Sequence, residues 1–237
     1  MEGRAQRLND PAFQQAGLTL ILPGIQSRSF AEADLALGLA DGGLTGRIEV
    51  LDWTTGWFFR AVRHLWDVEM HEAGGAEAAR RIVDHRERFP AAPVSIVGYS
   101  GGASVALHAL RRLPAGVTAT RTVLLSPACS PTVDAAALEV RCDEGIDSFC
   151  SRLDWPILVL LMTALGTTDR LRRPAAGWAG FERTDPADDR FREYRWRPAW
   201  VRDFHYGGHF GAVNRVFAAE RLAPLLMERQ RGGTSAA

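Results

Sequence analysis

The residues that decide the fold are Pro-Val-Ser-Ile-Val-Gly-Tyr-Ser-Gly-Gly, at positions 93–102. Val94–Val97 is a short, mostly apolar run with β-branched side chains, which is typical of a buried strand. Gly98–Gly102 matches the pattern G-x-S-x-G, and Ala103–Leu113 has helical character. A strand, a sharp turn and a helix in this order give the pattern its catalytic meaning. We therefore expect Ser100 to lie on a strained turn with its hydroxyl group above a sheet.

Glycine suits positions 98, 101 and 102 of such a turn, because side chains there would collide with neighbouring backbone. The pattern alone is weak evidence, since the chain contains 23 glycines. A glycine-rich turn whose serine does no chemistry is the alternative interpretation. The choice between the two depends on the rest of the chain.

Composition narrows the class of protein. The 237 residues fit one large domain, and the apolar content of 46% is typical of a globular protein. Acidic and basic residues balance at 28 each, so no basic surface field indicates nucleic acid or an anionic membrane as a partner. Every basic residue is arginine, and the absence of lysine excludes a Schiff-base lysine and a P-loop lysine.

Cysteine usage and the N-terminal residues favour a cytoplasmic protein. Cys129, Cys142 and Cys150 are odd in number and have no CxxC spacing, so we expect reduced, partly buried thiols and no zinc site, with a single disulfide as the alternative. No apolar segment at the N-terminus resembles a signal peptide. The longest apolar run, Trp155–Leu165, is too short to span a bilayer.

Strand-like and helix-like segments alternate along the chain. The expected strands are Leu18–Leu22, Arg47–Leu51, Val94–Val97, Thr120–Leu125, Pro156–Leu161 and Trp196–Asp203. The expected helices are Ser29–Ala40 with a Ser29/Glu32 capping box, Glu77–Phe89, Ala103–Leu113 and Ala212–Arg229, with small helices in 128–154.

This alternation predicts an α/β fold of three layers, a doubly wound and mostly parallel sheet of about six strands with helices on both faces. No linker divides the chain, so residues 17–230 are interpreted as one domain, after a lead-in at 1–16 and before a tail at 231–237. In such sheets the working site lies at the carboxyl ends of the strands.

Three of the expected strand ends carry residues that can act together. Ser100 comes first, Asp169 follows 69 residues later, and His209 comes 40 residues after that. A serine hydroxyl needs a base within hydrogen-bond reach, and a neutral histidine serves when a carboxylate holds its tautomer. Hydrogen-bond donors must also face the developing oxyanion, and each lowers the activation barrier by roughly 3–4 kcal/mol.

At these residues the sequence resembles the α/β-hydrolase family, over about residues 17–230. The likeness is carried by Gly98–Gly102, Gly166–Asp169 and Gly208–Phe210, in the family order of nucleophile, acid and histidine. The resemblance implies that Ser100 is the nucleophile, Asp169 the acid and His209 the base. It also implies oxyanion donors at the backbone N–H groups of Gly101 and of Ile25, in the loop after the first strand.

The chain departs from the family in several places. Many members have His-Gly where this chain has Pro23-Gly24, which bears on the assignment of Ile25. The early antiparallel strands of larger members are missing, and residues 128–154 are too few for a large lid. We therefore expect a compact, minimal version of the fold with an open site.

Each assignment has an alternative. Asp169 could instead cap a helix, in which case Asp154 is the substitute acid, and His205 competes with His209. His64 and His71 lie seven residues apart with Asp67 between them, a spacing that suits a metal face, but a solvated helix is the preferred interpretation.

Two further groups of residues have both a structural and a functional interpretation. The aromatic residues Trp53, Trp57, Phe58, Phe59 and Trp66 are expected in the core or on a helix packing face, with the wall of an apolar acyl pocket as the alternative. A solvated loop surface is expected for the following arginines, with a role in binding an anionic substrate as the alternative: 170, 172, 173, 183, 190, 192, 195, 197 and 202.

The resulting expectation is a serine hydrolase that cleaves a small-molecule carboxylic ester or thioester through an acyl-enzyme, with no cofactor and no metal. A serine peptidase or an acyltransferase would use the same machinery. A hydrolase-fold protein that binds without catalysis is the alternative from another class. Substrate specificity and oligomeric state do not follow from the sequence.

Overall fold

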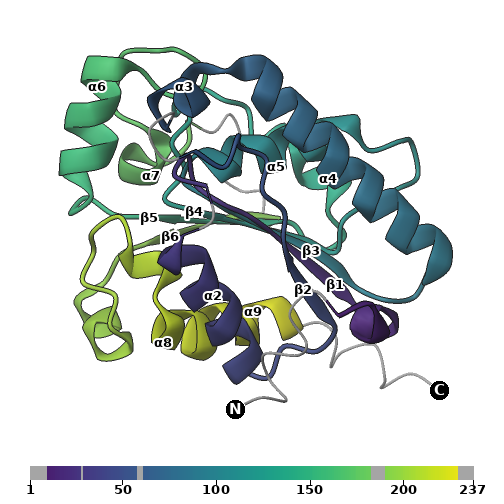
Figure 1. Ribbon diagram of the computed structural model, residues 1–237. Helices are drawn as coiled ribbons and strands as arrows, with labels where there is room; N and C mark the ends of the chain where they lie inside the picture. Colours follow the sequence, from purple (N-terminus) through teal and green to yellow (C-terminus); the bar gives the residue numbers. More distant parts are fainter. Residues whose placement is uncertain (1–9, 28, 58–60, 183–189, 229–237) are drawn as a thin grey trace.

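The computed structural model describes residues 10–27, 29–57, 61–182 and 190–228, which form an α/β structure around one six-stranded sheet (Figure 1). Its strands are all parallel and lie in the order β2-β1-β3-β4-β5-β6. Their bounds are β1 Leu18–Leu22, β2 Arg47–Val50, β3 Val94–Tyr99, β4 Arg121–Leu125, β5 Ile146–Cys150 and β6 Phe191–Arg195. The predicted α/β class with a parallel sheet of about six strands is confirmed.

Helices cover both faces of the sheet (Figure 1). One face carries α2 (Phe30–Asp41) and the nearly continuous helix formed by α8 (Arg215–Phe217), η7 (Ala218–Leu222) and α9 (Ala223–Met227). The other carries α3 (Ala61–Trp66), α4 (Val68–Arg88), α5 (Gly101–Arg112), α6 (Met162–Leu165) and α7 (Ala176–Ala179). Shorter turns are η1 (Pro11–Ala16), η3 (Ala136–Arg141), η4 (Pro156–Leu161), η5 (Pro198–Asp203) and η6 (Gly211–Val213).

The core is divided into two main clusters by the sheet. Leu20 of β1 packs in the cluster that contains α4 and α5, whereas its neighbour Ile21 packs in the cluster that contains α2 and α9. Successive side chains of a strand point to opposite faces, so a strand buried on both sides reads as a continuous apolar run. This is why Leu18–Leu22, fully buried, was recognisable in the sequence.

The start of α2 follows the predicted capping box. The backbone N–H of Ala31 donates to Ser29 Oγ at 3.2 Å, and the backbone N–H of Ser29 donates to Glu32 Oε2 at 2.8 Å. These reciprocal bonds satisfy donors that would otherwise lack partners at the helix N-terminus.

Helix α4 begins at Val68, nine residues before the predicted start at Glu77. Asp67 caps it by accepting from the backbone N–H of Met70 at 3.0 Å. Gly74 and Gly75 lower helix propensity, but they let neighbouring elements approach. A Cβ on Gly74 would lie 2.6 Å from Trp53 Cβ, and one on Gly75 would lie 2.6 Å from His108 Cβ. Tertiary packing therefore extends the helix through residues whose local preference opposes it.

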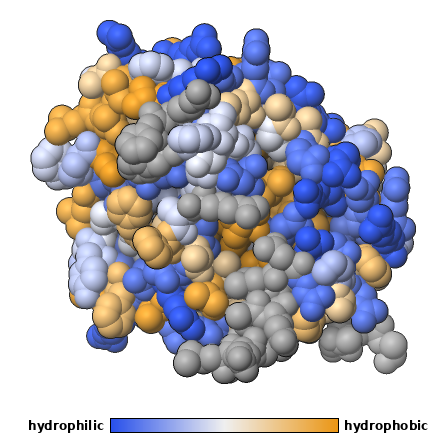
Figure 2. Space-filling view, in the orientation of Figure 1, coloured by the Kyte–Doolittle hydropathy of each residue, from blue (hydrophilic) through white to orange (hydrophobic). Residues whose placement is uncertain are grey.

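The predicted strand Pro156–Leu161 is wrong, because these residues form the helical turn η4 and continue into α6. Leu160 is 56% exposed and Leu161 is 38% exposed, whereas Leu158 is buried, so the run lies on a helix with one exposed face and not in the sheet. Figure 2 shows hydrophobic surface at the upper left, where α6 lies in Figure 1. Pro156 is the first residue of the helix, a position that proline favours.

The fifth strand is instead β5, in a segment where only small helices were predicted. Its second residue, Asp147, is fully buried. Arg121 of β4 donates to Asp147 Oδ2 at 2.9 Å, and Arg192 of β6 donates to Oδ1 at 2.7 Å. A buried carboxylate needs such partners, and they come from the two neighbouring strands. The charged residue Asp147 therefore concealed an internal strand of the sheet.

The predicted last strand, Trp196–Asp203, is also wrong. The strand is β6, which ends at Arg195, and Pro198–Asp203 forms the 3-10 turn η5. Pro198 has no backbone N–H for a ladder, which favours its position at the start of that turn.

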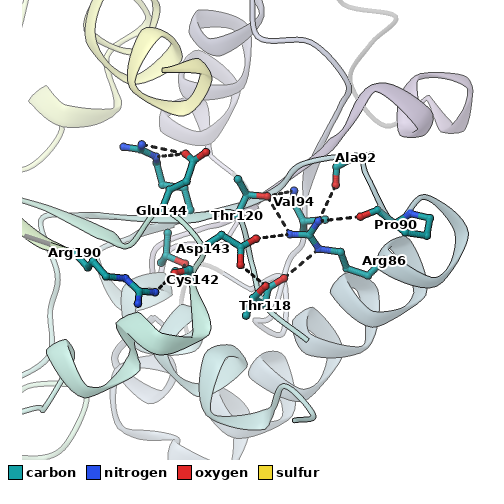
Figure 3. A network of polar contacts seen from close by, with 12 residues as sticks. Arg86, Pro90, Ala92, Val94, Thr118, Thr120, Cys142, Asp143, Glu144 and Arg190 are labelled. Carbon is teal, nitrogen blue, oxygen red and sulfur yellow. Dashed lines mark hydrogen bonds and ion pairs between the residues drawn. The ribbon is translucent and has the colours of Figure 1, made fainter. Parts of the chain in front are cut away.

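Arg86, near the end of α4, ties together the loops that precede β3, β4 and β5 (Figure 3). Its guanidinium group donates to the carbonyl oxygens of Thr118 and Ala92, each at 3.1 Å, and also contacts Thr120 Oγ1 at 3.1 Å and Asp143 Oδ2 at 3.2 Å. The rigid fork of an arginine suits this convergence of acceptors. The contacts hold the amino edge of the sheet, opposite to the edge that carries Ser100.

The ends of the chain lie partly outside the described residues. Of the predicted lead-in, Pro11–Ala16 forms the 3-10 turn η1, while residues 1–9 and the predicted tail at 231–237 are not described. Among the helices that are described, none combines the length and the apolar character needed to cross a membrane.

Candidate active site

Ser100 lies between the end of β3 and the start of α5, as predicted. Its φ is 53° and its ψ is −115°, a strained conformation for a residue with a side chain. The backbone N–H of Ser100 donates to the Leu125 carbonyl at 2.8 Å, which anchors the turn to β4. A Cβ on Gly98 would lie 2.7 Å from the carbonyl oxygen of Gly102, so glycine is needed for the sharp reversal.

His209 reaches Ser100 from the loop that follows η5. The distance between His209 Nε2 and Ser100 Oγ is 3.0 Å, within hydrogen-bond range. The imidazole ring lies 5.2 Å from the ring of Tyr99, whose hydroxyl group is 3.4 Å from the His209 carbonyl oxygen. The predicted pairing of Ser100 and His209 is therefore present in the structure.

The carboxylate that contacts His209 belongs to Asp154, not to Asp169. Asp154 Oδ2 lies 2.6 Å from His209 Nδ1, so the Nδ1–H donates to the carboxylate and Nε2 is left to accept from the serine hydroxyl. Asp154 follows the end of β5 by four residues. The expectation that Asp169 orients His209 is therefore wrong. Asp169 was expected to be the acid because it follows residues 156–161, which were predicted to form the fifth strand and are helical in the structure.

Asp169 serves a different set of contacts. Its Oδ1 accepts from the backbone N–H of Ser130 at 2.8 Å and from Thr167 Oγ1 at 2.6 Å, while its Oδ2 accepts from Ser130 Oγ at 2.5 Å. These bonds tie the loop after β4 to the loop after α6. Asp169 therefore neither contacts the histidine nor caps a helix.

Burial shapes the electrostatics of the Asp154–His209 pair. Asp154 is 1% exposed, and burial raises the pKa of its carboxyl group, while the hydrogen bond and charge of His209 act in the opposite direction. Asp154 Oδ1 has no hydrogen-bond partner among the described residues. A buried carboxylate with so few donors stabilises a positive charge on the adjacent imidazole.

The backbone of Ile25 lies close to Gly101, the residue that follows Ser100. A Cβ placed on Gly101 would lie 3.5 Å from the backbone nitrogen of Ile25, so the two predicted oxyanion donors belong to adjacent parts of the structure. Within the described residues, neither N–H group has an acceptor. Gly101 is the first residue of α5, and N–H groups at a helix N-terminus lack partners within the helix. The arrangement can receive a negatively charged oxygen.

The loop that carries Ile25 is held by side chains from three elements. His64 Nδ1 lies 2.8 Å from the Ile25 carbonyl oxygen, and Trp53 Nε1 donates to the Pro23 carbonyl at 2.7 Å. The backbone N–H of Gly24 donates to Glu32 Oε1 at 3.3 Å. These contacts hold the backbone of residues 23–25 in place. The position of this loop therefore depends on side chains for which the sequence suggested other roles.

The preferred interpretation of His64 and His71 as part of a solvated helix is wrong. His64 is fully buried and its Nε2 lies 2.8 Å from Thr55 Oγ1. His71 is 1% exposed and its Nε2 lies 2.6 Å from the His64 carbonyl oxygen. Among the described residues no cluster of three or more His, Cys, Asp or Glu could hold a metal ion. Both histidines support the loop around Ile25.

Of the described aromatic residues considered for an acyl pocket, Trp53 is the one that reaches the turn at Ser100. Its Cζ2 would lie 3.4 Å from a Cβ on Gly101, and its side chain is buried. Trp57 is 65% exposed, and Trp66 is half-exposed and donates to the Leu165 carbonyl. Phe58 and Phe59 lie outside the described residues.

Most arginines of the 170–202 region have structural partners. Arg170 donates to the Trp66 carbonyl, Arg190 to the carbonyls of Glu139 and Cys142, and Arg192 to Asp147. Arg173 forms an ion pair with Glu182, and Arg195 forms one with Glu193. The solvated exceptions are Arg172, Arg197 and Arg202, and Arg183 lies outside the described residues.

The three cysteines are free, buried thiols, and no two of them form a disulfide. Burial raises the pKa of Cys129 and of Cys142 to about 12 and that of Cys150 to about 11. Thiols with such pKa values are protonated at neutral pH and are poor nucleophiles.

His205, the competitor of His209, is a buried structural residue. Its ring stacks on Trp200 at 5.5 Å between centroids, and its Nδ1 accepts from the backbone N–H of Gly207 at 3.1 Å. A proton on Nδ1 would break this bond, which keeps the imidazole neutral. Consistent with this geometry, burial lowers the pKa of His205 from 6.5 to about 4.

His205 is expected to make folding stability depend on pH. Its folded pKa is depressed, so the unfolded chain binds the extra proton first, and stability falls as pH drops from about 6.5 towards about 4. Between pH 7 and pH 5 the loss from this group is about 2 kcal/mol. Urea unfolding of wild type and His205→Asn at both pH values measures it. The substitution keeps a hydrogen-bond acceptor near Gly207. If wild type and His205→Asn lose the same unfolding free energy between pH 7 and pH 5, His205 is not the group responsible.

A comparison of the sequence with protein-family models and with curated proteins gave no match, so the geometry of Ser100, His209 and Asp154 is the basis for assigning a function.

Proposed function

We propose that the protein is a serine hydrolase that cleaves a carboxylic ester or thioester through an acyl-enzyme, with the triad Ser100–His209–Asp154 and the minimal α/β-hydrolase fold that its sequence resembles. The observation that carries the proposal is the chain of contacts from Ser100 Oγ to His209 Nε2 at 3.0 Å and from His209 Nδ1 to Asp154 Oδ2 at 2.6 Å. The strand order is consistent with this fold.

In the first step, Ser100 Oγ attacks the carbonyl carbon while its proton passes to His209 Nε2. Asp154 stabilises the imidazolium that forms, and the N–H groups of Gly101 and Ile25 stabilise the oxyanion. The imidazolium then protonates the departing alcohol or thiol, leaving an acyl group on Ser100. Water, deprotonated by His209, attacks the acyl carbon; the bond to Ser100 Oγ then breaks, the imidazolium returns the proton to Oγ, and the carboxylic acid is released.

Apolar side chains beside the site favour an uncharged acyl group. Ile25 packs against a cluster that contains Leu65, Ala128, Leu158 and Met162. The backbone N–H of Ala128 donates to the Ser100 carbonyl at 3.2 Å, so this cluster adjoins the turn. The cluster is buried, so it makes the surroundings of the turn apolar and leaves the partly exposed Ile25 as the apolar group that a substrate can contact.

A fluorophosphonate probe tests the proposal, because an activated serine displaces its fluoride and becomes phosphonylated. Wild type is expected to gain one adduct, located on Ser100 by peptide mass spectrometry. Ser104→Ala is the matched control, since Ser104 lies one helical turn further along α5 and its hydroxyl contacts Thr168. Ser104→Ala should label like wild type and Ser100→Ala should not. The proposal fails if wild type is unlabelled or if Ser100→Ala labels equally.

A further inference from the structure

A cavity of about 280 Å³ lies at the edge of the sheet opposite to Ser100. It is bounded by the first residues of β1 and β2, Leu18 and Arg47, and by the second half of α4. Ser100 follows the carboxyl end of β3, and all strands are parallel, so the two sites are separated by the length of the sheet. Figure 2 shows hydrophilic surface at the right, where this half of α4 lies.

Arginine dominates the lining of the cavity. The guanidinium groups are those of Arg47, Arg80, Arg81 and Arg88, and the carboxylates are those of Glu49 and Asp84. Four positive charges therefore face two negative charges at neutral pH.

The two carboxylates of the cavity are already neutralised. Glu49, which is 6% exposed, pairs with Arg47 at 3.0 Å and also with Arg81. Asp84 pairs with Arg80 at 2.6 Å. Glu77, outside the cavity, accepts from both Arg80 and Arg81.

Donors remain unused in the part of the chain that the structure describes. The Nε of Arg47 is buried and has no acceptor there, and the exposed Arg88 has no ion-pair partner there. These two groups come from different elements, β2 and α4, and line the same cavity.

His85 is the clearest sign of a missing partner. It lines the cavity and is only 3% exposed, yet neither of its ring nitrogens has a hydrogen-bond partner among the described residues. The ring packs against Phe89 at 5.3 Å. Burial and the charge of Arg86 lower its pKa to about 4, so at neutral pH it carries one N–H donor. Buried polar groups are rarely left unpaired, and a ligand in the cavity would supply an acceptor.

We propose that this cavity binds a small oxyanion of the phosphate class, at a site separate from the proposed catalytic site. Guanidinium groups match the geometry of phosphate oxygens, and a tetrahedral anion can accept from Arg47, Arg88 and His85 at once. A planar carboxylate offers fewer directions in which to accept from these three side chains, which come from β2 and α4. The volume exceeds the roughly 30 Å³ share of one water molecule several-fold, which leaves room for phosphate and a small substituent.

Isothermal titration calorimetry at neutral pH and constant ionic strength tests the proposal with inorganic phosphate, glycerol phosphate and acetate. Saturable 1:1 binding of either phosphate compound is expected, with much weaker binding of acetate. Phosphate binding alone indicates the free ion as ligand, and tighter binding of glycerol phosphate indicates a phosphate ester. Equal binding of acetate and phosphate would overturn the assignment of the anion class.

Arg88→Gln is the primary variant because Arg88 is exposed, and its loss should leave the fold intact. It is expected to raise the Kd for phosphate at least about tenfold, as is Arg47→Gln. Arg112→Gln is the matched control, since Arg112 is an exposed arginine of α5 that pairs with Glu72 outside the cavity. An unchanged Kd in Arg88→Gln, or an equal change in Arg112→Gln, would overturn the proposal.

A second measurement needs no variant. The ¹⁵N resonances of the His85 ring, followed by NMR during the phosphate titration, are expected to shift with the same Kd as the calorimetric signal. Binding that leaves these resonances unmoved would place phosphate elsewhere and would contradict the proposed site. Neither measurement depends on turnover, so a failure of the hydrolase proposal would not affect the result.

Discussion

Asp154→Asn is expected to lower kcat for a nitrophenyl ester by about a thousandfold to ten-thousandfold. Asp154 Oδ2 accepts from His209 Nδ1 at 2.6 Å, and an amide at this position would lose the charge that stabilises the imidazolium. An amide can also turn its NH₂ group towards Nδ1, which selects the tautomer that cannot accept the Ser100 proton. The loss should appear in kcat more than in KM, because the interaction strengthens in the transition state.

Asp169→Asn is the matched control for this prediction. It makes the same chemical change at the acid that the sequence favoured, in a carboxylate bonded to Ser130 and Thr167. We expect kcat to stay within the same order of magnitude as in wild type, with a lower stability against urea. A larger loss of kcat in Asp169→Asn than in Asp154→Asn would show that Asp169, not Asp154, acts during catalysis.

Gly102→Ala is expected to destabilise the protein by more than about 4 kcal/mol, a large part of the stability of an ordinary domain. A Cβ on Gly102 would overlap the carbonyl oxygen of Leu22 and lie 2.5 Å from that of Pro23. Both atoms are backbone, at the end of β1, which pairs with β3 through Leu22 and Gly98. Relief of the clash would require the start of α5 to move away from the sheet, which would disturb the turn at Ser100.

Gly208→Ala is the control for Gly102→Ala. Its Cβ would meet no atom within 4 Å and its φ is not positive, so we expect a change within about 0.5 kcal/mol. Urea unfolding followed by circular dichroism compares the two variants with wild type. A wild-type unfolding midpoint for Gly102→Ala would mean that α5 and β1 do not approach as closely as described.

The fold class was predictable because its signals are local. The apolar run Leu18–Leu22, the capping residues Ser29 and Glu32, and the turn at Gly98–Gly102 each contain their own evidence. Periodicity and turn residues report on the environment of a few consecutive positions. Most of the elements that such signals indicated were found, with the largest shift at the start of α4, but the strands predicted at 156–161 and 196–203 were not.

The acid was not predictable from the same signals. Choosing between Asp154 and Asp169 required the position of the fifth strand, and that strand is built around the buried Asp147. Its charge is tolerated because Arg121 and Arg192, 26 residues before it and 45 residues after it, reach it from both sides. No local pattern reports such a pairing, whereas the apolar residues 156–161 imitate a strand.

The sequence by itself determined an α/β chain with a serine on a glycine-rich turn, because that turn is specified by neighbouring residues. Only the tertiary structure decided which carboxylate contacts His209 and which residues hold the loop of Ile25. It also brought Arg47 and His85 to one cavity. These outcomes depend on contacts between residues far apart in the chain, whose free energies are absent from any short segment.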